Sequence, residues 1–262
     1  MKKPWINYIR SHDDIPWVFS DIDIQHTGAD ALSTKIFLDA FYSGEHPDSF
    51  ASGLPFMRDK ETQLARISGT LASLAGLERA LLVNNSTGID LSIQRILLLH
   101  SVFLSIGGIP LLYLGDEVGT LNDYSFRAAE AKRDDSRWVN RPAKSWVKDN
   151  QALKSRETPE AKIFERLRHM IGLRKNLHQL SGDTLEVLDT GKRSVLAYRR
   201  GQESDAVVVL ANFSEFKTEI NSHYLLIANI RGEYRELISN VNLDIKGCIT
   251  LAPYQSLWLV KS

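Results

Sequence analysis

The chain has 262 residues, of which 43% are hydrophobic and 24% charged, a composition typical of an ordinary globular protein. Its 32 Lys and Arg residues equal its 32 Asp and Glu residues, so no overall field favours nucleic acid or an anionic membrane as a partner. A single cysteine, Cys248, excludes an internal disulfide and a cysteine-rich metal cluster. We expect Cys248 to be a small buried residue, and nothing in the sequence calls for a cofactor or a metal ion.

The N-terminal sequence MKKPWINYIRSHDD has no apolar stretch long enough for a signal peptide, which favours a cytoplasmic location. The most apolar segment, Ile96 to Leu114, is interrupted by His100, two glycines and Pro110. Such interruptions suit a helix, a turn and a strand better than a membrane span.

Residues 5–9 form a short aromatic and β-branched run that predicts a strand, and the polar cluster RSHDD follows directly. Residues 15–87 are irregular, with one helix expected through Ala29 to Phe41. A second helical stretch, RISGTLASLAGL, places Ile67, Leu71, Leu74 and Leu77 on one apolar face. We interpret 15–87 as a helical insertion.

Residues 88–106 are apolar on most sides and predict a buried helix, which Gly107 and Gly108 end before a strand at 109–114. Strand, helix and strand in this order are typical of a parallel sheet. A long loop at 115–156 is a candidate binding loop, and helical spacing resumes at 158–178.

After Gly182 the sequence changes to short alternating or β-branched runs separated by turn formers, which predicts an all-β sandwich with a boundary near Ser181. The expected strands are TLEVLDT, SVLAYRR, AVVVLANFS, TEINSHYLLIA, EYRELI, CITL and SLWLV.

Two motifs carry candidate chemistry. SHDDI follows the first strand, and GGIPLLYLGDEVG, from Gly107 to Gly119, places a buried strand before a Gly-Asp-Glu turn. Taken alone, the first fits a solvated cap and the second a hydrophilic turn. Their order and spacing, however, resemble the last two strands of the alpha-amylase barrel. The longer strings NYIRSHDDI, ARISGTLASLAGL, YLGDEVGTLNDYSF, DDSRWVNRP and RHMIGLRKN resemble amylosucrase, a glycoside hydrolase family 13 enzyme.

This resemblance implies an α/β fold, the C-terminal part of a TIM (β/α)8 barrel followed by a β-sandwich. Residues 1–14 would end barrel strand seven, 15–87 would be the insertion, 88–181 the rest of the barrel and 182–262 the sandwich. The implied partners are sucrose, an α-glucan acceptor and a separate N-terminal barrel half, with neither nucleic acid nor membrane.

The resemblance also implies roles for individual residues. Asp13 would stabilise an oxocarbenium-like transition state, and His12 would bind hydroxyls of the same glucosyl unit. Asp14 and Arg66 would hold the fructosyl half of sucrose or the acceptor, although a surface ion pair is the alternative. Arg137 would close the bottom of the glucose pocket.

Three positions depart from the family pattern. Pro16 stands where glycine is usual, Asn140 where histidine is usual, and Lys35 where an acceptor-binding arginine is expected. Lysine keeps the charge of arginine but loses its planar fork. Lys35 is therefore a substrate-binding candidate with a weakened grip on oligosaccharides.

Retaining glycosidases also need a nucleophilic and an acid/base carboxylate, which this family places on barrel strands four and five. Neither string occurs in this sequence, so we expect the isolated chain to be a catalytically inactive fragment of a glucosyltransferase that uses sucrose. A fragment of a sucrose hydrolase and a non-catalytic carbohydrate-binding or interaction remnant are the alternatives.

Overall fold

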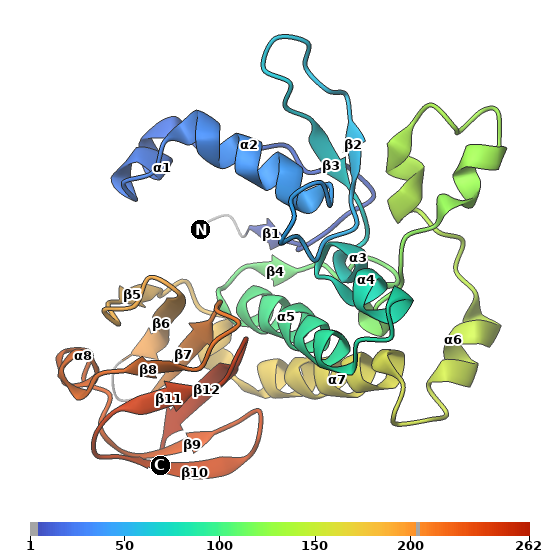
Figure 1. Ribbon diagram of the computed structural model, residues 1–262. Coiled ribbons are helices and arrows are strands. Elements are labelled where there is room, and N and C mark those ends of the chain that lie inside the picture. Colours follow the sequence, from blue (N-terminus) through green and yellow to red (C-terminus); the bar gives the residue numbers. More distant parts are fainter. Residues whose placement is uncertain (1–4, 203–204) are drawn as a thin grey trace. The chain divides into compact units, whose positions relative to one another are not determined.

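The computed structural model describes residues 5–202 and 205–262, which divide into two compact units (Figure 1). The sheet unit comprises the described residues among 1–9, 93–112 and 162–262. The hairpin unit comprises 10–92 and 113–161. Each unit is described by itself, and the four-segment division expected from the sequence stays a prediction.

In the sheet unit, β1 (Ile6–Asn7) and β4 (Ile109–Pro110) pair in parallel, with Ile6 opposite Ile109. This confirms the predicted direction of the two strands, although both are shorter than predicted. Gly108 lies between the helix and β4 with φ of 70°, and a Cβ there would lie 2.7 Å from the carbonyl oxygen of Trp5. Glycine is therefore required where β4 approaches the N-terminal segment. The remaining strands of a barrel stay a prediction.

The C-terminal region forms a six-stranded antiparallel sheet with the strand order β10-β9-β12-β7-β6-β5. This confirms that the region is mainly antiparallel β structure. The strands in chain order are β5 (Glu186–Leu188), β6 (Val195–Gln202), β7 (Asp205–Asn212), β9 (Gly232–Glu236), β10 (Val241–Ile245) and β12 (Ser256–Lys261).

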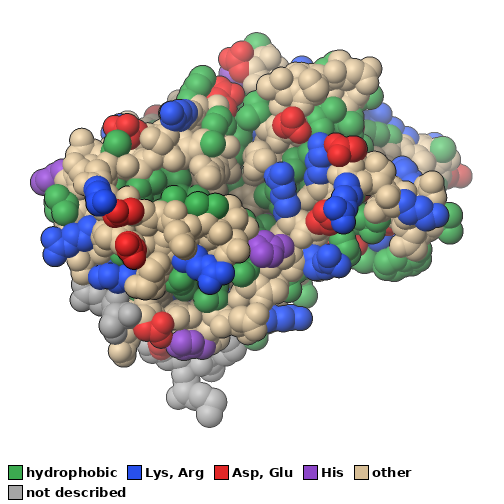
Figure 2. Space-filling view, turned by 90° about the horizontal axis from the view of Figure 1, so that it is seen from below, with side chains coloured by type: hydrophobic (Ala, Val, Ile, Leu, Met, Phe, Trp, Pro, Cys, Tyr) green, Lys and Arg blue, Asp and Glu red, His purple; other side chains and the backbone are tan. Residues whose placement is uncertain are grey.

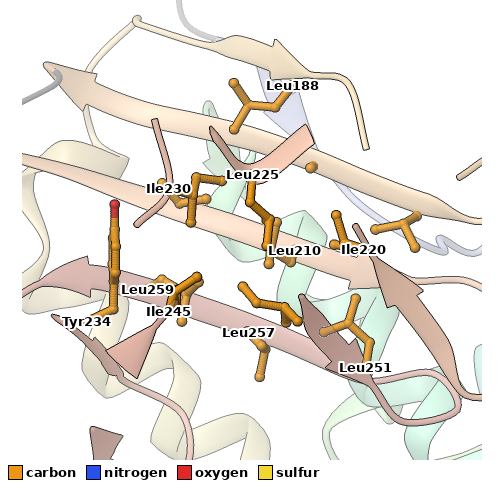
Figure 3. Close-up of a cluster of buried hydrophobic side chains, with 14 residues drawn as sticks. Leu188, Leu210, Ile220, Leu225, Ile230, Tyr234, Ile245, Leu251, Leu257 and Leu259 are labelled. Carbon is orange, nitrogen blue, oxygen red and sulfur yellow. The ribbon is translucent and has the colours of Figure 1, made fainter. Parts of the chain in front are cut away.

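One face of this sheet carries a cluster of buried hydrophobic side chains, in which alternate residues of the long strands point the same way (Figure 3). A two-stranded sheet of β8 (Thr218–Ile220) and β11 (Ile249–Leu251), together with helix α8 (Ser222–Ile227), supplies the opposing side chains. The second layer is thus smaller than a full sandwich would have.

The other face of the sheet packs on helix α5 (Ser86–Ser105). The indole N–H of the fully buried Trp258 donates to Ser101 Oγ over 2.8 Å, and the hydroxyls of Tyr198 and Ser105 lie 2.6 Å apart. By length and composition alone α5 could span a membrane, but these contacts show a helix packed on a sheet. Helix α7 (Pro159–Asn176) joins it through Arg174, which donates to the carbonyl of Leu104.

Three predictions for the C-terminal region were wrong or incomplete. The run TEINSHYLLIA is a strand only at its start, because the Asn221 side chain accepts from the His223 N–H and begins α8. Strand β10 was not predicted, since its sequence VNLDI is half polar. Cys248, expected to be buried, is exposed.

The hairpin unit begins with helices α1 (Asp21–His26) and α2 (Ala31–Tyr42), the second of which confirms the predicted helix. Its antiparallel hairpin joins β2 (Leu54–Phe56) to β3 (Arg66–Ser68). The second predicted helical stretch was wrong at its start, because Ile67 lies in β3. Only its later part is helical, in α3 (Leu71–Leu74) and α4 (Leu77–Leu82), where the Thr70 hydroxyl caps α3.

The long segment after β4 contains short helical turns rather than one regular element. These are the 3-10 helices η1 (Asp116–Val118), η2 (Tyr124–Ala128) and η3 (Ser136–Asn140), followed by α6 (Trp146–Ala152). A further 3-10 helix, η4 (His178–Leu180), follows α7 in the sheet unit.

Charged side chains of both signs are interspersed on the face of the molecule shown in Figure 2. Both kinds occur there, as in the whole sequence, which has 32 Lys and Arg and 32 Asp and Glu residues.

Candidate functional site

The candidate site centres on the segment Ser11–Asp14, which follows β1 in the chain and belongs to the hairpin unit. Its backbone is held by two side chains that are distant in sequence and by Arg10, which directly precedes it. Asn140 Nδ2 donates to the Ser11 carbonyl over 3.1 Å, Arg141 Nε to the His12 carbonyl over 2.8 Å, and Arg10 Nη2 to the Asp13 carbonyl over 2.6 Å. The side chains of His12 and Asp13 are exposed.

Asp13 contacts Arg137, which the sequence predicted to share its site 124 positions away. Arg137 Nη1 lies 3.4 Å from Asp13 Oδ1. The same guanidinium makes a two-pronged pair with Asp135, with Nε and Nη2 at 2.9 and 3.0 Å from its two oxygens, and lies 4.5 Å from the centre of the Phe56 ring. The hydrogen bonds between these two side chains lower the pKa of Asp135 and raise the pKa of Arg137. Arg137 therefore joins two carboxylates and one aromatic ring.

Asp14 and Arg66 form the second predicted pair. Arg66 Nη1, on β3, lies 3.5 Å from Asp14 Oδ2. The Asp14 side chain is only 5% exposed and the Arg66 side chain 54% exposed, so the carboxylate is enclosed while the cation faces solvent. A backbone bridge between Ile15 and Ile67 fixes the two segments next to each other, with mutual N–H to O distances of 2.8 and 3.1 Å.

Lys35 does not contact either pair. Its ammonium lies 2.7 Å from Asp21 Oδ1 and 5.9 Å from the centre of the Phe19 ring, which joins α2 to the segment before it. The structure therefore shows a local role for Lys35, and its expected role in acceptor binding stays a prediction.

Asp116, in the Gly-Asp-Glu turn, is 6% exposed. Burial raises its pKa to about 7, while the positive charge of Arg10 lowers it and the negative charge of Glu117 raises it further. The neighbouring Glu117 pairs with Lys144 over 2.7 Å, and Lys144 also lies 3.0 Å from Asp149 of α6. In this turn the Asp116 carboxyl thus interacts with the charge of Arg10, and the Glu117 carboxylate is linked to α6 through Lys144.

Sequence reasoning did not find Arg10, Arg141 and Asp135 as parts of the site. The available signal was their position, since each lies within three residues of a residue that was singled out. Arg10 and Arg141 donate to backbone carbonyls, and Asp135 accepts from the guanidinium of Arg137. Neither kind of contact requires a recognisable sequence motif. Within 5–202 and 205–262, no three His, Cys, Asp or Glu side chains gather as metal ligands would.

The comparisons with known proteins concern the C-terminal region and, for whole proteins, about 56 to 64% of the chain. Residues 185–258 match the family described as the maltogenic amylase C-terminal domain. This part of the chain is therefore similar to a C-terminal domain found in enzymes of the alpha-amylase superfamily. It contains β5 to β12 apart from the last residues, so the six-stranded sheet and its apolar cluster are the fold of that domain.

Two curated proteins are similar over a larger part of the chain. The glucosylglycerate phosphorylase of Escherichia coli (strain K12) is 30% identical over 167 residues, which are 63% of this chain and 28% of that protein. Alpha-amylase 3 of Dictyoglomus thermophilum is 25% identical over 163 residues, 56% of this chain and 32% of that protein. The chain therefore spans about a third or less of the length of these relatives.

A solved structure of AmyP in complex with maltose superimposes with a TM-score of 0.50 and 17% identity, covering 64% of this chain and 34% of that one. At that identity the likeness concerns the fold alone. The similar proteins are amylases and a glycosyl phosphorylase, which makes this chain related to carbohydrate-active enzymes without defining its substrate.

Proposed function

We propose that this chain supplies the transition-state stabiliser and the sugar-binding side chains of an α-retaining glucosyltransferase that uses sucrose as donor. The observation that carries the proposal is the Asp13 side chain, an exposed carboxylate on a held backbone and 3.4 Å from Arg137. A fixed anion is the group needed beside the positive charge that develops on the sugar ring.

His12 and Asp14 complete the proposed site. His12 is exposed next to Asp13 and would bind hydroxyls of the glucosyl unit, while the Asp14 and Arg66 pair would bind the fructosyl unit or the acceptor. The solvent-facing Arg66 supports this role, because its side chain is 54% exposed, and the enclosed Asp14 carboxylate would contribute by holding Arg66.

The remaining carboxylates of the reaction would come from a separate N-terminal barrel half. The exposed apolar side chains of the parallel strand pair support such a partner, since Trp5, Ile6 and Ile109 are 81, 63 and 52% exposed. Both strands also keep an open edge in the part of the chain that the structure describes, because β1 and β4 pair only with each other there.

The test is reconstitution with an N-terminal barrel half taken from a sucrose-acting relative. The chain alone is expected to release neither fructose nor glucose from sucrose, and the mixture is expected to release fructose in a coupled assay. Asp13→Asn keeps the shape and removes the charge, so it should abolish the activity. Reconstituted activity that survives Asp13→Asn would contradict the role of Asp13.

A second candidate is favoured by the phosphorylase relative. In this reading the glucosyl unit passes to inorganic phosphate rather than to a glucan. The same reconstituted mixture distinguishes the two functions, since phosphorolysis yields glucose 1-phosphate and depends on added phosphate. Fructose release that is independent of phosphate favours the glucan acceptor or water, and the yield of free glucose separates those two.

A further inference from the structure

Three consecutive carbonyl groups of the Ser11–Asp14 segment each accept a hydrogen bond from a different side chain. The donors come from two places in the chain: Arg10 directly precedes the segment, and Asn140 and Arg141 end η3 about 130 positions later. Two of the three donors are charged, and such hydrogen bonds are the stronger ones. We call these three side chains the carbonyl clamp.

Two donors of the clamp, Arg10 and Asn140, are themselves buried and hydrogen-bonded elsewhere. Arg10 is 5% exposed and uses its Nε to donate to the Gly69 carbonyl over 2.9 Å, which ties it to the turn between β3 and α3. Asn140 is fully buried, and its own carbonyl accepts from the Tyr113 hydroxyl over 3.3 Å. A donor that is itself held in place restrains the position of the carbonyl to which it donates.

The orientation of the Asn140 amide follows from the clamp. Its Nδ2 donates to Ser11, whereas its buried Oδ1 has no hydrogen-bond partner. The reverse orientation would place Oδ1 against the Ser11 carbonyl oxygen, two acceptors facing each other. The hydrogen bond to the Ser11 carbonyl therefore determines the orientation of the Asn140 amide.

We propose that Arg10, Asn140 and Arg141 are positioning residues that fix where the Asp13 carboxylate and the His12 ring stand. This inference rests on the proposed function, since it assigns these residues to the same site. The clamp acts on the backbone alone and leaves both reactive side chains exposed, so they can meet a sugar without contacting the residues that orient them.

Arg10 also affects a second group, because its positive charge lowers the pKa of the buried Asp116 carboxyl, which burial raises. Replacement of Arg10 would therefore change both the Asp13 carbonyl, to which Arg10 donates, and the Asp116 carboxyl.

The experiment uses the full chain with uniform nitrogen-15 and carbon-13 labels. Amide order parameters of Ser11–Asp14 report the clamp, and the carbon shift of the Asp13 carboxyl reports binding of 1-deoxynojirimycin, a cationic glucose mimic. In the unaltered chain we expect rigid amides, with order parameters of about 0.85.

Arg10→Met, Asn140→Leu and Arg141→Met should each lower these order parameters toward about 0.6 and weaken binding of the mimic by roughly tenfold or more, because a misplaced catalytic group loses its effect. Asn140→His should restore both, since an imidazole N–H can donate to the Ser11 carbonyl. A purely structural role would not produce this rescue.

Arg79→Met is the matched control. Arg79 also donates to a backbone carbonyl, that of Ser49, over 2.6 Å in the same unit. It should leave the order of Ser11–Asp14 and the Asp13 shift unchanged. Clamp variants that leave the segment as rigid as in the unaltered chain would overturn the inference.

Asp13→Asn separates the clamp from the proposed function. It should abolish binding of 1-deoxynojirimycin while the segment stays rigid. If the unaltered chain shows no Asp13 shift with the mimic, the proposed function loses its support, and the order parameters of the clamp variants still decide whether the clamp exists.

Discussion

The two units of this chain are stabilised by different interactions. In the sheet unit, strands of up to eight residues bury one face on an apolar cluster and the other on α5, and Trp258, Tyr198 and Leu210 are at most 1% exposed. In the hairpin unit the strands have three residues, and the candidate site depends on hydrogen bonds from side chains to backbone carbonyls, two of them about 130 positions away. Regular burial gives the sheet unit its stability, and specific polar contacts give the hairpin unit its geometry.

The hairpin unit also leaves more apolar surface uncovered along its helices. Val18, Ile22 and Leu32 are 82, 64 and 52% exposed around α1 and α2. The hydrophobic effect therefore stabilises the hairpin unit less along these helices, because their apolar side chains stay in contact with water. Charge and pH should therefore affect the two units in different ways.

The largest expected effect concerns the sheet unit. Trp258→Ala should lower the free energy of unfolding by about 3 to 5 kcal/mol, because it opens a cavity under α5 and leaves the Ser101 hydroxyl without its indole donor. Urea unfolding followed by circular dichroism measures the loss. Trp146→Ala on α6, where the ring is 61% exposed, is the control and should change the value by no more than about 0.5 kcal/mol.

The next effect concerns the hairpin unit between about pH 4 and pH 7. Burial raises the pKa of Asp116 to about 7, above its ordinary value of 3.8, so the folded chain binds a proton that the unfolded chain has released. Stability from this group is full below about pH 4 and is lost as pH rises through 7, by at most about 4 kcal/mol. Asp116→Asn should remove this contribution, so in urea unfolding the variant should gain stability relative to the unaltered chain as pH rises from 4 to 7 and no further above pH 7.

A pH dependence of opposite sign is expected in the sheet unit. His100 is fully buried on α5, and burial lowers its pKa to about 4 from 6.5. The folded chain therefore binds fewer protons than the unfolded chain, and stability present above pH 6.5 falls by about 3 kcal/mol as pH drops toward 4. This window overlaps that of Asp116 with the opposite sign, so the two slopes should largely cancel in the unaltered chain between about pH 4 and 6.5. His100→Gln should uncover the loss of stability with rising pH that Asp116 causes, and a profile that neither substitution changes would contradict both assignments.

The sheet unit was largely predictable because alternation along a strand is a local property of the sequence. The apolar, β-branched run from Val207 to Ala211 predicts a buried strand from local sequence alone. The parallel direction of β1 and β4 was predicted from the order strand, helix, strand. The prediction failed at Asn221, where a side chain caps a helix inside a β-branched run, since capping competes with strand formation over only a few residues.

The candidate site was less predictable. The pairing of Arg66 with Asp14 was expected from the family resemblance, whereas Arg137 was expected near Asp13 but paired with an acidic residue from outside this chain; the structure brings Arg137 to Asp13 and to Asp135. Arg10 and Arg141 donate to backbone carbonyls, which every residue possesses, so nothing in the local sequence identifies their partners. For Lys35 the sequence position was matched to the family, but a matched position does not determine which neighbour a long side chain contacts.

The smallest expected effect separates the two roles of Lys35. If its pairing with Asp21 is only a tie between α1 and α2, Lys35→Met should cost about 0.3 to 1 kcal/mol, since ion pairs near the surface contribute little. The loss should shrink in 1 M salt, where the screening length is about 3 Å. Asp21→Asn should give the same loss, and the double substitution should cost no more than either single one, because both remove one interaction.

In the reconstituted mixture, Lys35→Met should leave the rate of fructose release from sucrose unchanged. A selective fall in transfer to long glucans would instead show that Lys35 leaves Asp21 to bind the acceptor, and Lys35→Arg, with its planar fork, should then raise that transfer.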